Sequence, residues 1–470
     1  MTRFKWAALL SAIAAAAFFT FVYATTPAWA ACDPDDEAAW TESVVLEVVE
    51  GENLTTEAES LMLAAGIPPD EWGPAADCGR VLAELPFVFS VGLRMTPAEA
   101  AAAGRAQHGK GVQAVTTAFT IELSPEGVMG AAYFGPQITP SGYTRIGAEP
   151  LSDDAVDGEG FADVDIATVD TGIDAGHRDL NVVGGHDCTH EAMLGLREPD
   201  AWRRDNFGHG THTAGTDSAI DNDVDTLGVA AGARQWSLPV LGDTGSGTMF
   251  TLLCGANWLL EHASTIEAAN WSLGGFNAWS ECWSWDTLHN AFCRMDQAGI
   301  VNVVSAGNGG TDSTSYSPAN YGELDTVVVV EALTDYDGQP GGLAAPPEGI
   351  PTVYRDDWRA LFSNYGPMDD AIAPGVYIPS TTPANTIAYA HGTSMAAPHV
   401  TGTIAAHLAE HPTETGAEAV AAVLAWSAQP GWTVRSGWDA YVGPTDVPLI
   451  RFGAPSYDEL VANGTITEEP

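Results

Sequence analysis

The sequence predicts an α/β fold with a mostly parallel central sheet and helices on both of its faces. From residue 138 onward, apolar runs of strand length alternate with segments whose composition is typical of helices. This alternation favours parallel strands joined by crossover helices, which pack on both faces of the sheet. Polar residues flanked by glycine follow several of the apolar runs. Because chemistry in such sheets gathers beyond the carboxyl ends of the strands, we expect the site there.

The predicted elements follow one another in a regular order. Runs rich in apolar and β-branched residues predict strands at 162–169, 235–241, 267–273, 300–305 and 326–332. Between and after them, helices are predicted at 211–220, 249–263, 287–298, 394–411 and 418–428. Ahead of this domain, an acidic region is predicted to be α+β, with helices at 55–65 and 96–107 and strands at 85–93 and 114–123.

The first 30 residues have the pattern of a secretory signal. Arg3 and Lys5 precede an alanine-rich apolar stretch, and Ala28-Trp29-Ala30 matches a small-x-small cleavage site. We expect a secreted protein without a membrane anchor once the signal is removed; acylation of Cys32, giving a lipoprotein, is the alternative. The predicted parts are a signal at 1–30, an α+β region at 31–137 and a larger domain at 138–470.

The charge balance excludes one class of partner. The formal net charge is −45, from 62 acidic against 17 basic residues. A nucleic-acid partner is therefore not expected, because phosphate binding needs clustered basic side chains. Adaptation to salt and a compositional bias of the source explain the acidity equally well. The six cysteines favour disulfides in a secreted chain, although their spacing leaves the pairing open.

Four residues are candidates for catalysis. Asp170 ends a buried run in Asp-Thr-Gly-Ile-Asp, and His209 lies between glycines in Gly-His-Gly-Thr-His. Asn308 follows Ser-Ala-Gly, and Ser394 lies in Gly-Thr-Ser-Met-Ala at the start of a helix. Taken singly, each could be a turn or capping residue. Together they supply an orienter, a base, an oxyanion donor and a nucleophile.

These motifs carry a resemblance to a known family. With Asn-Trp-Ser-Leu-Gly-Gly at 270–275, they occur in the order typical of subtilases, the subtilisin-like serine proteases, and the texture is most similar to the secreted proteinase K-like group. The resemblance covers about 138–454 and implies a three-layer subtilisin-like fold. It also implies that Asp170 orients His209, that His209 takes the proton of Ser394, and that Asn308 and the Ser394 N–H hold the oxyanion.

The same resemblance implies how peptide substrates bind. Two segments resemble those that clamp the peptide as an added strand, a mode that gives affinity with little sequence preference. The side chain before the cut is expected between the second clamp and 305–307, where no acidic residue occurs, so an apolar preference is predicted. The substrate-binding residues so implied are Gly245, Ser246, Gly247, Ser272, Leu273, Gly274, Ala306 and Gly307.

The resemblance further implies a propeptide, disulfides and calcium. Residues 31–137 would be an inhibitory propeptide, cut near 136–138. Two cysteine pairs, Cys188–Cys254 and Cys282–Cys293, resemble pairs in secreted relatives, which leaves Cys32 with Cys78. No cofactor is expected for catalysis. A structural calcium is implied at Asp370 with the carbonyls of Gly322 and Leu324; the alternative is that Asp370 is an ordinary surface residue.

The expected function is that of a monomeric, secreted serine endopeptidase of broad specificity. A selective processing protease and a non-catalytic binding protein on the same scaffold are the alternatives. Three features depart from the family pattern. Ala231 stands where relatives often carry proline, His391 stands where a small polar residue is common, and residues 338–359 form an insertion-like Gly/Pro-rich segment.

Overall fold

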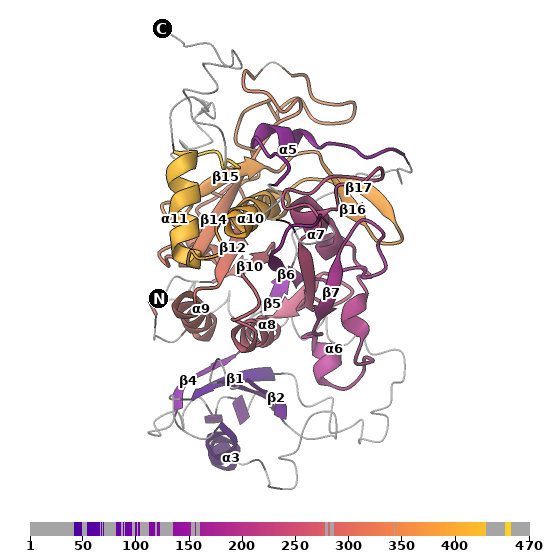
Figure 1. Ribbon diagram of the computed structural model, residues 1–470. Coiled ribbons are helices and arrows are strands. Elements are labelled where there is room, and N and C mark those ends of the chain that lie inside the picture. The colour runs from indigo at the N-terminus through magenta and orange to yellow at the C-terminus, as the bar shows by residue number, and fades with distance from the viewer. Residues whose placement is uncertain are drawn as a thin grey trace. The chain divides into compact units, whose positions relative to one another are not determined.

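The computed structural model describes residues 135–428 except 152–155, 157–159, 278–280, 283–285 and 343, together with 447–452 and parts of 42–122 (Figure 1). The chain divides into two compact units. The first comprises Met1–Ala118 with Glu191–Glu198, and the second comprises Phe119–His190 with Pro199–Pro470. The predicted signal, and both Cys32 and Cys78, lie outside the described residues.

The first unit contains a four-stranded antiparallel sheet with one described long helix. The strand order is β2-β3-β1-β4. The helix packs Leu61 and Met62 against Val91 and Leu93 of the sheet. The prediction of one strand at 85–93 was wrong: the chain leaves β2 just before Pro86, which has no N–H to donate to a ladder. The elements are β1 (Glu42–Val48), α3 (Leu54–Ala65), β2 (Val81–Leu85), β3 (Ser90–Met95) and β4 (Val112–Thr117).

A seven-stranded sheet forms the centre of the second unit. Its order is β15-β14-β12-β10-β6-β8-β7, and every pairing between neighbours in it is parallel. All residues of β6, β10, β12 and β14 are buried, as expected of strands covered on both faces. The strands are β6 (Asp165–Asp170), β7 (Val182–Gly185), β8 (Arg234–Pro239), β10 (Ala268–Trp271), β12 (Val301–Ser305), β14 (Val327–Leu333) and β15 (Ala371–Pro374).

Helices cover both faces of this sheet. Ile166 and Val303 share a buried cluster with residues of α10 and α11, whereas Val169 and Trp271, which point to the opposite face by strand alternation, contact α8 and α9. The predicted α/β architecture is therefore confirmed, and the helix predicted at 287–298 has those bounds. The helices are α7 (His209–Ser218), α8 (Met249–Glu261), α9 (Thr287–Ala298), α10 (Thr393–Glu410) and α11 (Gly416–Ser427).

Short elements complete the second unit. The sequence did not predict the antiparallel hairpin of β16 (Ile378–Thr382) and β17 (Thr386–Ala390), which leads directly into α10. The strand predicted at 114–123 was also wrong as one element, because β4 and β5 belong to different sheets. The other strands and α-helix of this unit are β5 (Thr120–Glu122), α5 (Ser141–Arg145), β9 (Ser246–Thr248), β11 (Gly275–Phe276) and β13 (Tyr316–Ser317), whereas α6 (His190–Met193) lies mostly in Glu191–Glu198 of the first unit.

Two disulfides join segments of the second unit. Cys188, after β7, is bonded to Cys254 in α8, and Cys282 is bonded to Cys293 in α9. Both pairs are those that the family resemblance implied.

Candidate active site

The end of β6 and the start of α7 bring an aspartate and a histidine together. Asp170 is the last residue of β6 and is fully buried, and His209 is the first residue of α7. Both carboxylate oxygens of Asp170 lie 2.8 Å from His209 Nδ1. Because Nδ1–H donates to the carboxylate, the lone pair of the neutral ring is on Nε2, and Nε2 is the atom that can accept a proton.

A second buried carboxylate fixes the start of α7. Asp205 accepts hydrogen bonds from the N–H groups of Phe207, Gly208 and Thr211 and from the hydroxyls of Thr171 and Thr211. These contacts satisfy N–H groups that have no acceptor within the helix. The sequence analysis missed this role, although an aspartate four residues before His209 is the available signal. Asp205 thus holds the helix that carries His209.

Ser394 is the second residue of α10 and is 4% exposed. Its Oγ donates to the carbonyl of Ser272 at 3.3 Å, while Ser272 Oγ donates to the carbonyl of Ser394 at 2.9 Å. The N–H groups of the first helical turn have no intrahelical acceptor, and the helix dipole places partial positive charge there. The backbone at Ser394 is therefore suited to bind an anion.

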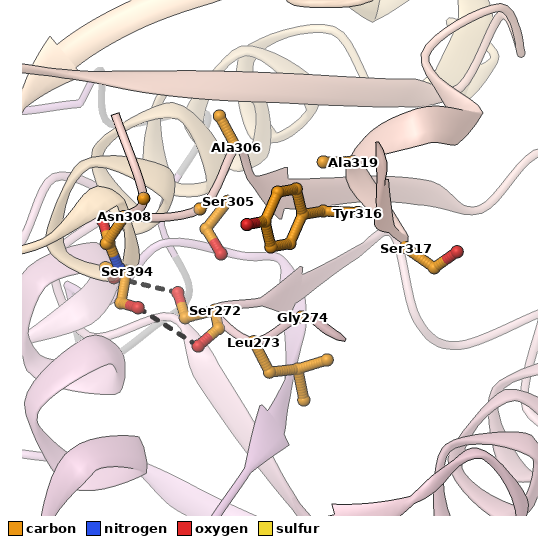
Figure 2. Close-up of a pocket in the computed structure, with 12 residues that line it drawn as sticks. Ser272, Leu273, Gly274, Ser305, Ala306, Asn308, Tyr316, Ser317, Ala319 and Ser394 are labelled. Carbon is orange, nitrogen blue, oxygen red and sulfur yellow. Dashed lines mark hydrogen bonds between the residues drawn. The ribbon is translucent and has the colours of Figure 1, made fainter. Parts of the chain in front are cut away.

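The amide of Asn308 has one possible orientation. Its Oδ1 accepts from the main-chain N–H of Thr393 at 2.8 Å and from Thr393 Oγ1 at 2.9 Å. Because a main-chain N–H is always a donor, the atom that faces it must be the oxygen. The NH₂ group is thereby turned away from Thr393, and Figure 2 shows it beside Ser394. Thr393 was missed as a functional residue, although it directly precedes the nucleophile candidate.

The loop that carries Asn308 is held by Asn364. Asn364 Oδ1 accepts from the N–H groups of Gly309 and Thr311, and its Nδ2 donates to the carbonyl of Ala306. A Cβ at Gly307, where φ is 100°, would lie 2.5 Å from this amide. No pattern in the sequence links Asn364 to Asn308, since only the fold brings them together.

A pocket of about 140 Å³ opens beside Ser394 (Figure 2). The clamp residues Ser272, Leu273 and Gly274 form one wall, and the loop from β12 forms another. Tyr316 and Ser317 of β13 and Ala319 were not foreseen as lining residues. None of the residues that line the pocket carries a charge. They are Ser272, Leu273, Gly274, Ser305, Ala306, Gly307, Asn308, Gly309, Tyr316, Ser317, Ala319 and Ser394.

The other predicted clamp, at residues 245–247, overlaps a short strand. Gly245 adopts φ 73°, which favours glycine, and Ser246 and Gly247 belong to β9. β9 pairs antiparallel with β5, with Ile121 opposite Gly247. β5 also contacts β11, which follows the second clamp segment. A strand therefore lies between the two predicted clamps in this structure.

Known proteins resemble this chain in sequence and in fold. A sequence model described as the subtilase family, Peptidase S8, matches residues 162–444. This chain belongs to the subtilase family. Subtilisin DY of Bacillus licheniformis is 34% identical over 262 residues, which are 55% of this subtilase and 82% of subtilisin DY. Subtilisin E of Bacillus subtilis (strain 168) is 34% identical over 285 residues, which are 60% of this chain and 64% of subtilisin E.

The crystal structure of a cold-adapted subtilisin-like serine proteinase superposes with a TM-score of 0.51 at 27% identity. The match covers 68% of this subtilase and 99% of that chain, which confirms the subtilisin-like fold. By family and relatives, the protein is a subtilisin-like serine endopeptidase, a hydrolase that needs no cofactor for catalysis. The relatives do not distinguish a proteinase K-like subgroup.

The predicted calcium site lies at the start of β15. Asp370 Oδ2 accepts the N–H of Val329 at 2.9 Å, and burial raises the pKa of Asp370 to about 7. Leu324 accepts the N–H of Val327 through its carbonyl, and Gly322 packs on the carbonyl of Met368. The set of Asp370, Gly322 and Leu324 as calcium ligands stays a prediction.

Among the described residues, no helix is long and apolar enough to cross a bilayer.

Proposed function

We propose that this subtilase is a secreted endopeptidase of broad specificity with an apolar preference, in which Asp170, His209 and Ser394 act as the catalytic triad. The observation that carries this proposal is the pair of 2.8 Å contacts between Asp170 and His209 Nδ1, at the edge of the sheet where Ser394 and Asn308 share one pocket. Ser394 Oγ attacks the substrate carbonyl while His209 Nε2 accepts its proton. Asp170 stabilises the imidazolium that forms.

The oxyanion of the intermediate is held by the Asn308 NH₂ group and the Ser394 N–H. Both donors are in place before substrate binds, because Thr393 fixes the amide and α10 fixes the main chain. Donors that need no reorganisation stabilise developing charge most effectively. His209 then returns the proton to the leaving amine, and water hydrolyses the acyl-enzyme by the same steps. For the attack that begins this sequence, Ser394 Oγ must leave its contact with the Ser272 carbonyl and turn to His209 Nε2.

Labelling with a fluorophosphonate, which reacts with activated serines, tests this assignment. We expect stoichiometric labelling of Ser394, and cleavage of a peptide library with many accepted sequences. Cleavage of one sequence class alone would favour the selective processing protease. The absence of both labelling and cleavage would favour the non-catalytic binding protein.

The pocket beside Ser394 supports an apolar preference for the side chain before the cut. No lining residue is charged, so a lysine or arginine would lose part of its hydration without gaining an opposite charge. A cavity of about 150 Å³ holds a benzene molecule, and a leucine or phenylalanine side chain is of this order. Tyr316 lines this pocket, and its hydroxyl would be 3.3 Å from a Cβ placed on Gly309, on the loop that carries Asn308. We propose that its ring sets the depth of the pocket.

We expect Tyr316→Ala to shift the preference towards larger side chains. Removing the ring deepens the pocket, so kcat/KM for tryptophan relative to alanine before the cut should rise about tenfold. Matched peptide substrates that differ only at this position measure the ratio. Tyr316→Phe is the control, since it keeps the ring and should keep the ratio near that of the wild type. An unchanged ratio in Tyr316→Ala would show that Tyr316 does not set the depth.

The region before the catalytic domain is proposed to be an inhibitory propeptide. β5 pairs with β9 through Thr120, Ile121 and Glu122, and it lies beside β11. This is the place of the added strand that a peptide substrate would form. While β5 is in place, a substrate cannot pair with β9. The chain would thus be inhibited by its own segment until that segment leaves.

This position of β5 favours a cut between residues 123 and 134, earlier than the 136–138 inferred from the sequence. Gln137 and Ile138 donate their N–H groups to the carbonyls of Asp223 and Asp225, so that segment is built into the catalytic unit. Mass spectrometry of the secreted protein should give a mature N-terminus in this interval. An N-terminus after Ile138 would contradict the revised position. Recovery of the protein from the medium tests secretion. Because the mature enzyme would lack Cys32 and Cys78, their pairing and acylation of Cys32 are tested by mass spectrometry of the unprocessed chain.

A further inference from the structure

His391 and Gly392 form the connection between β17 and α10, the helix that carries Ser394. Gly392 adopts φ 153°, a conformation that residues with a side chain rarely adopt. The direction in which the chain enters α10 therefore depends on what holds these two residues. We call residues 391–394 the nucleophile turn.

Two hydrogen bonds fasten the nucleophile turn to the segment before β16. The N–H of Tyr377 donates to His391 Nδ1 at 2.7 Å, and the N–H of Gly392 donates to the carbonyl of Gly375 at 2.8 Å. The backbones are so close that a Cβ on Gly375 would lie 2.6 Å from the Gly392 oxygen. Gly375 also donates to the carbonyl of Leu333 at the end of β14. The turn is thereby tied to the central sheet.

Two tyrosine rings lie beside the half-buried imidazole of His391. The rings of Tyr354 and Tyr377 stack with it at centroid distances of 6.5 and 6.4 Å, and Tyr389 stacks on Tyr377. Among the described residues, the titratable groups in ring contact with His391 are the phenols of Tyr354 and Tyr377. Burial lowers the pKa of His391. Tyr354 belongs to the insertion-like segment 338–359, which therefore contributes to this enclosure.

The bond from Tyr377 requires a neutral histidine. Nδ1 can accept the N–H only when it carries no proton, so the ring hydrogen is on Nε2. Protonation of Nδ1 would place two donors against each other. The pKa of His391 is lower in the folded than in the unfolded protein. The stability that the neutral ring contributes to the folded state is therefore fully present above the ordinary histidine pKa of about 6.5. That effect is lost as the pH falls from there towards the folded-state pKa.

We propose that His391 is a positioning residue, whose neutral ring holds the nucleophile turn in the reactive conformation and whose protonation in acid releases it. The proposal rests on the assignment of Ser394 as the nucleophile. It also gives the insertion-like segment a purpose, since Tyr354 shields the ring on which the turn depends.

Two substitutions of His391 separate positioning from mere packing. His391→Ala removes the acceptor and leaves the Tyr377 N–H without a partner, whereas the Oδ1 of asparagine in His391→Asn can accept it without titrating. At about pH 8, we expect fluorophosphonate labelling and kcat to fall about tenfold in His391→Ala, with KM nearly unchanged, because the nucleophile is misplaced. His391→Asn should restore most of the rate. Equal rates in wild type and His391→Ala would overturn the proposal.

The pH dependence of labelling still tests the proposal if His391→Ala does not fold, because it compares wild type with His391→Asn. Protonation of His209 slows labelling in acid in every variant, so the informative quantity is each protein's labelling rate, measured in steps from about pH 6.5 down to about pH 4, divided by its rate at about pH 8. We expect this quotient to become about threefold higher for His391→Asn than for wild type as the pH falls through this range, because burial lowers the pKa of His391 below its ordinary value. Equal quotients would overturn the proposal. A wild type that is not labelled at any pH would instead overturn the assignment of Ser394.

Discussion

Ser394→Ala is expected to lower kcat by a factor of about 10⁶, the magnitude known for the nucleophile of subtilisin rather than one obtained from this structure. The alanine has no Oγ to attack the substrate carbonyl, so no acyl-enzyme forms. Fluorophosphonate labelling should also disappear. Hydrolysis of a chromogenic peptide by purified protein, with cleavage of the propeptide followed in the same preparation, measures both effects. If the chain cleaves itself, the variant should accumulate unprocessed.

Asn308→Leu is the comparison variant, which distinguishes the loss of an oxyanion donor from the loss of the nucleophile. Leucine keeps the approximate volume but removes the amide that Thr393 orients towards the oxyanion. Loss of one such donor in subtilisin lowers kcat by about 10²–10³. We therefore expect Asn308→Leu to be slow but labelled at Ser394, and Ser394→Ala to be unlabelled. Substantial turnover by Ser394→Ala would show that another group is the nucleophile.

Asp170→Asn is expected to lower kcat by about 10⁴, again the magnitude known for triad proteases. The carboxylate accepts from His209 Nδ1 through two oxygens at 2.8 Å, which leaves Nε2 as the base. An asparagine can present its NH₂ group instead, in which case Nδ1 must accept and Nε2 carries the hydrogen. His209 in that tautomer cannot take the proton of Ser394. Steady-state kinetics around pH 8 measure the loss.

Asp205→Asn is the matched control for this substitution. Asp205 is also buried and holds the start of α7, but its contacts go to main-chain N–H groups and threonine hydroxyls and not to the imidazole. We expect it to lower the melting temperature more than the intrinsic rate of the folded fraction. Equal losses of kcat in the two variants would indicate that Asp170 acts by holding structure and not by setting the tautomer of His209.

The sheet and its helices could be predicted because their signals are local. The valine-rich run of β14 and the helix at 287–298 differ from their surroundings in composition and periodicity over a few residues. Strand ends were predicted less well: the 85–93 prediction merged β2 with β3, since apolar content continues past Pro86. The hairpin of β16 and β17 was missed because its threonines and prolines do not form a continuous apolar run.

The candidate triad could be named from the sequence because each member lies in a short motif. The residues that hold it in place could not. Asn364 lies more than 50 residues from Asn308, and Tyr316 reaches the pocket only because β13 pairs with β11. The environment of His391 likewise depends on Tyr354, in a segment that the sequence left without a role.

The sequence by itself predicted which side chains would supply the nucleophile, base, orienter and oxyanion donor, and in which family that order occurs. Reactive groups of this kind need particular residue types next to particular turns, and a few consecutive residues of the sequence encode both. Only the tertiary structure decided the orientation of Asn308 by Thr393, the place of Tyr316 in the pocket lining, the strand β5 between the predicted clamps and the bond from Tyr377 to His391. These depend on contacts between segments far apart in the chain, whose geometry is set by the packing of the whole unit.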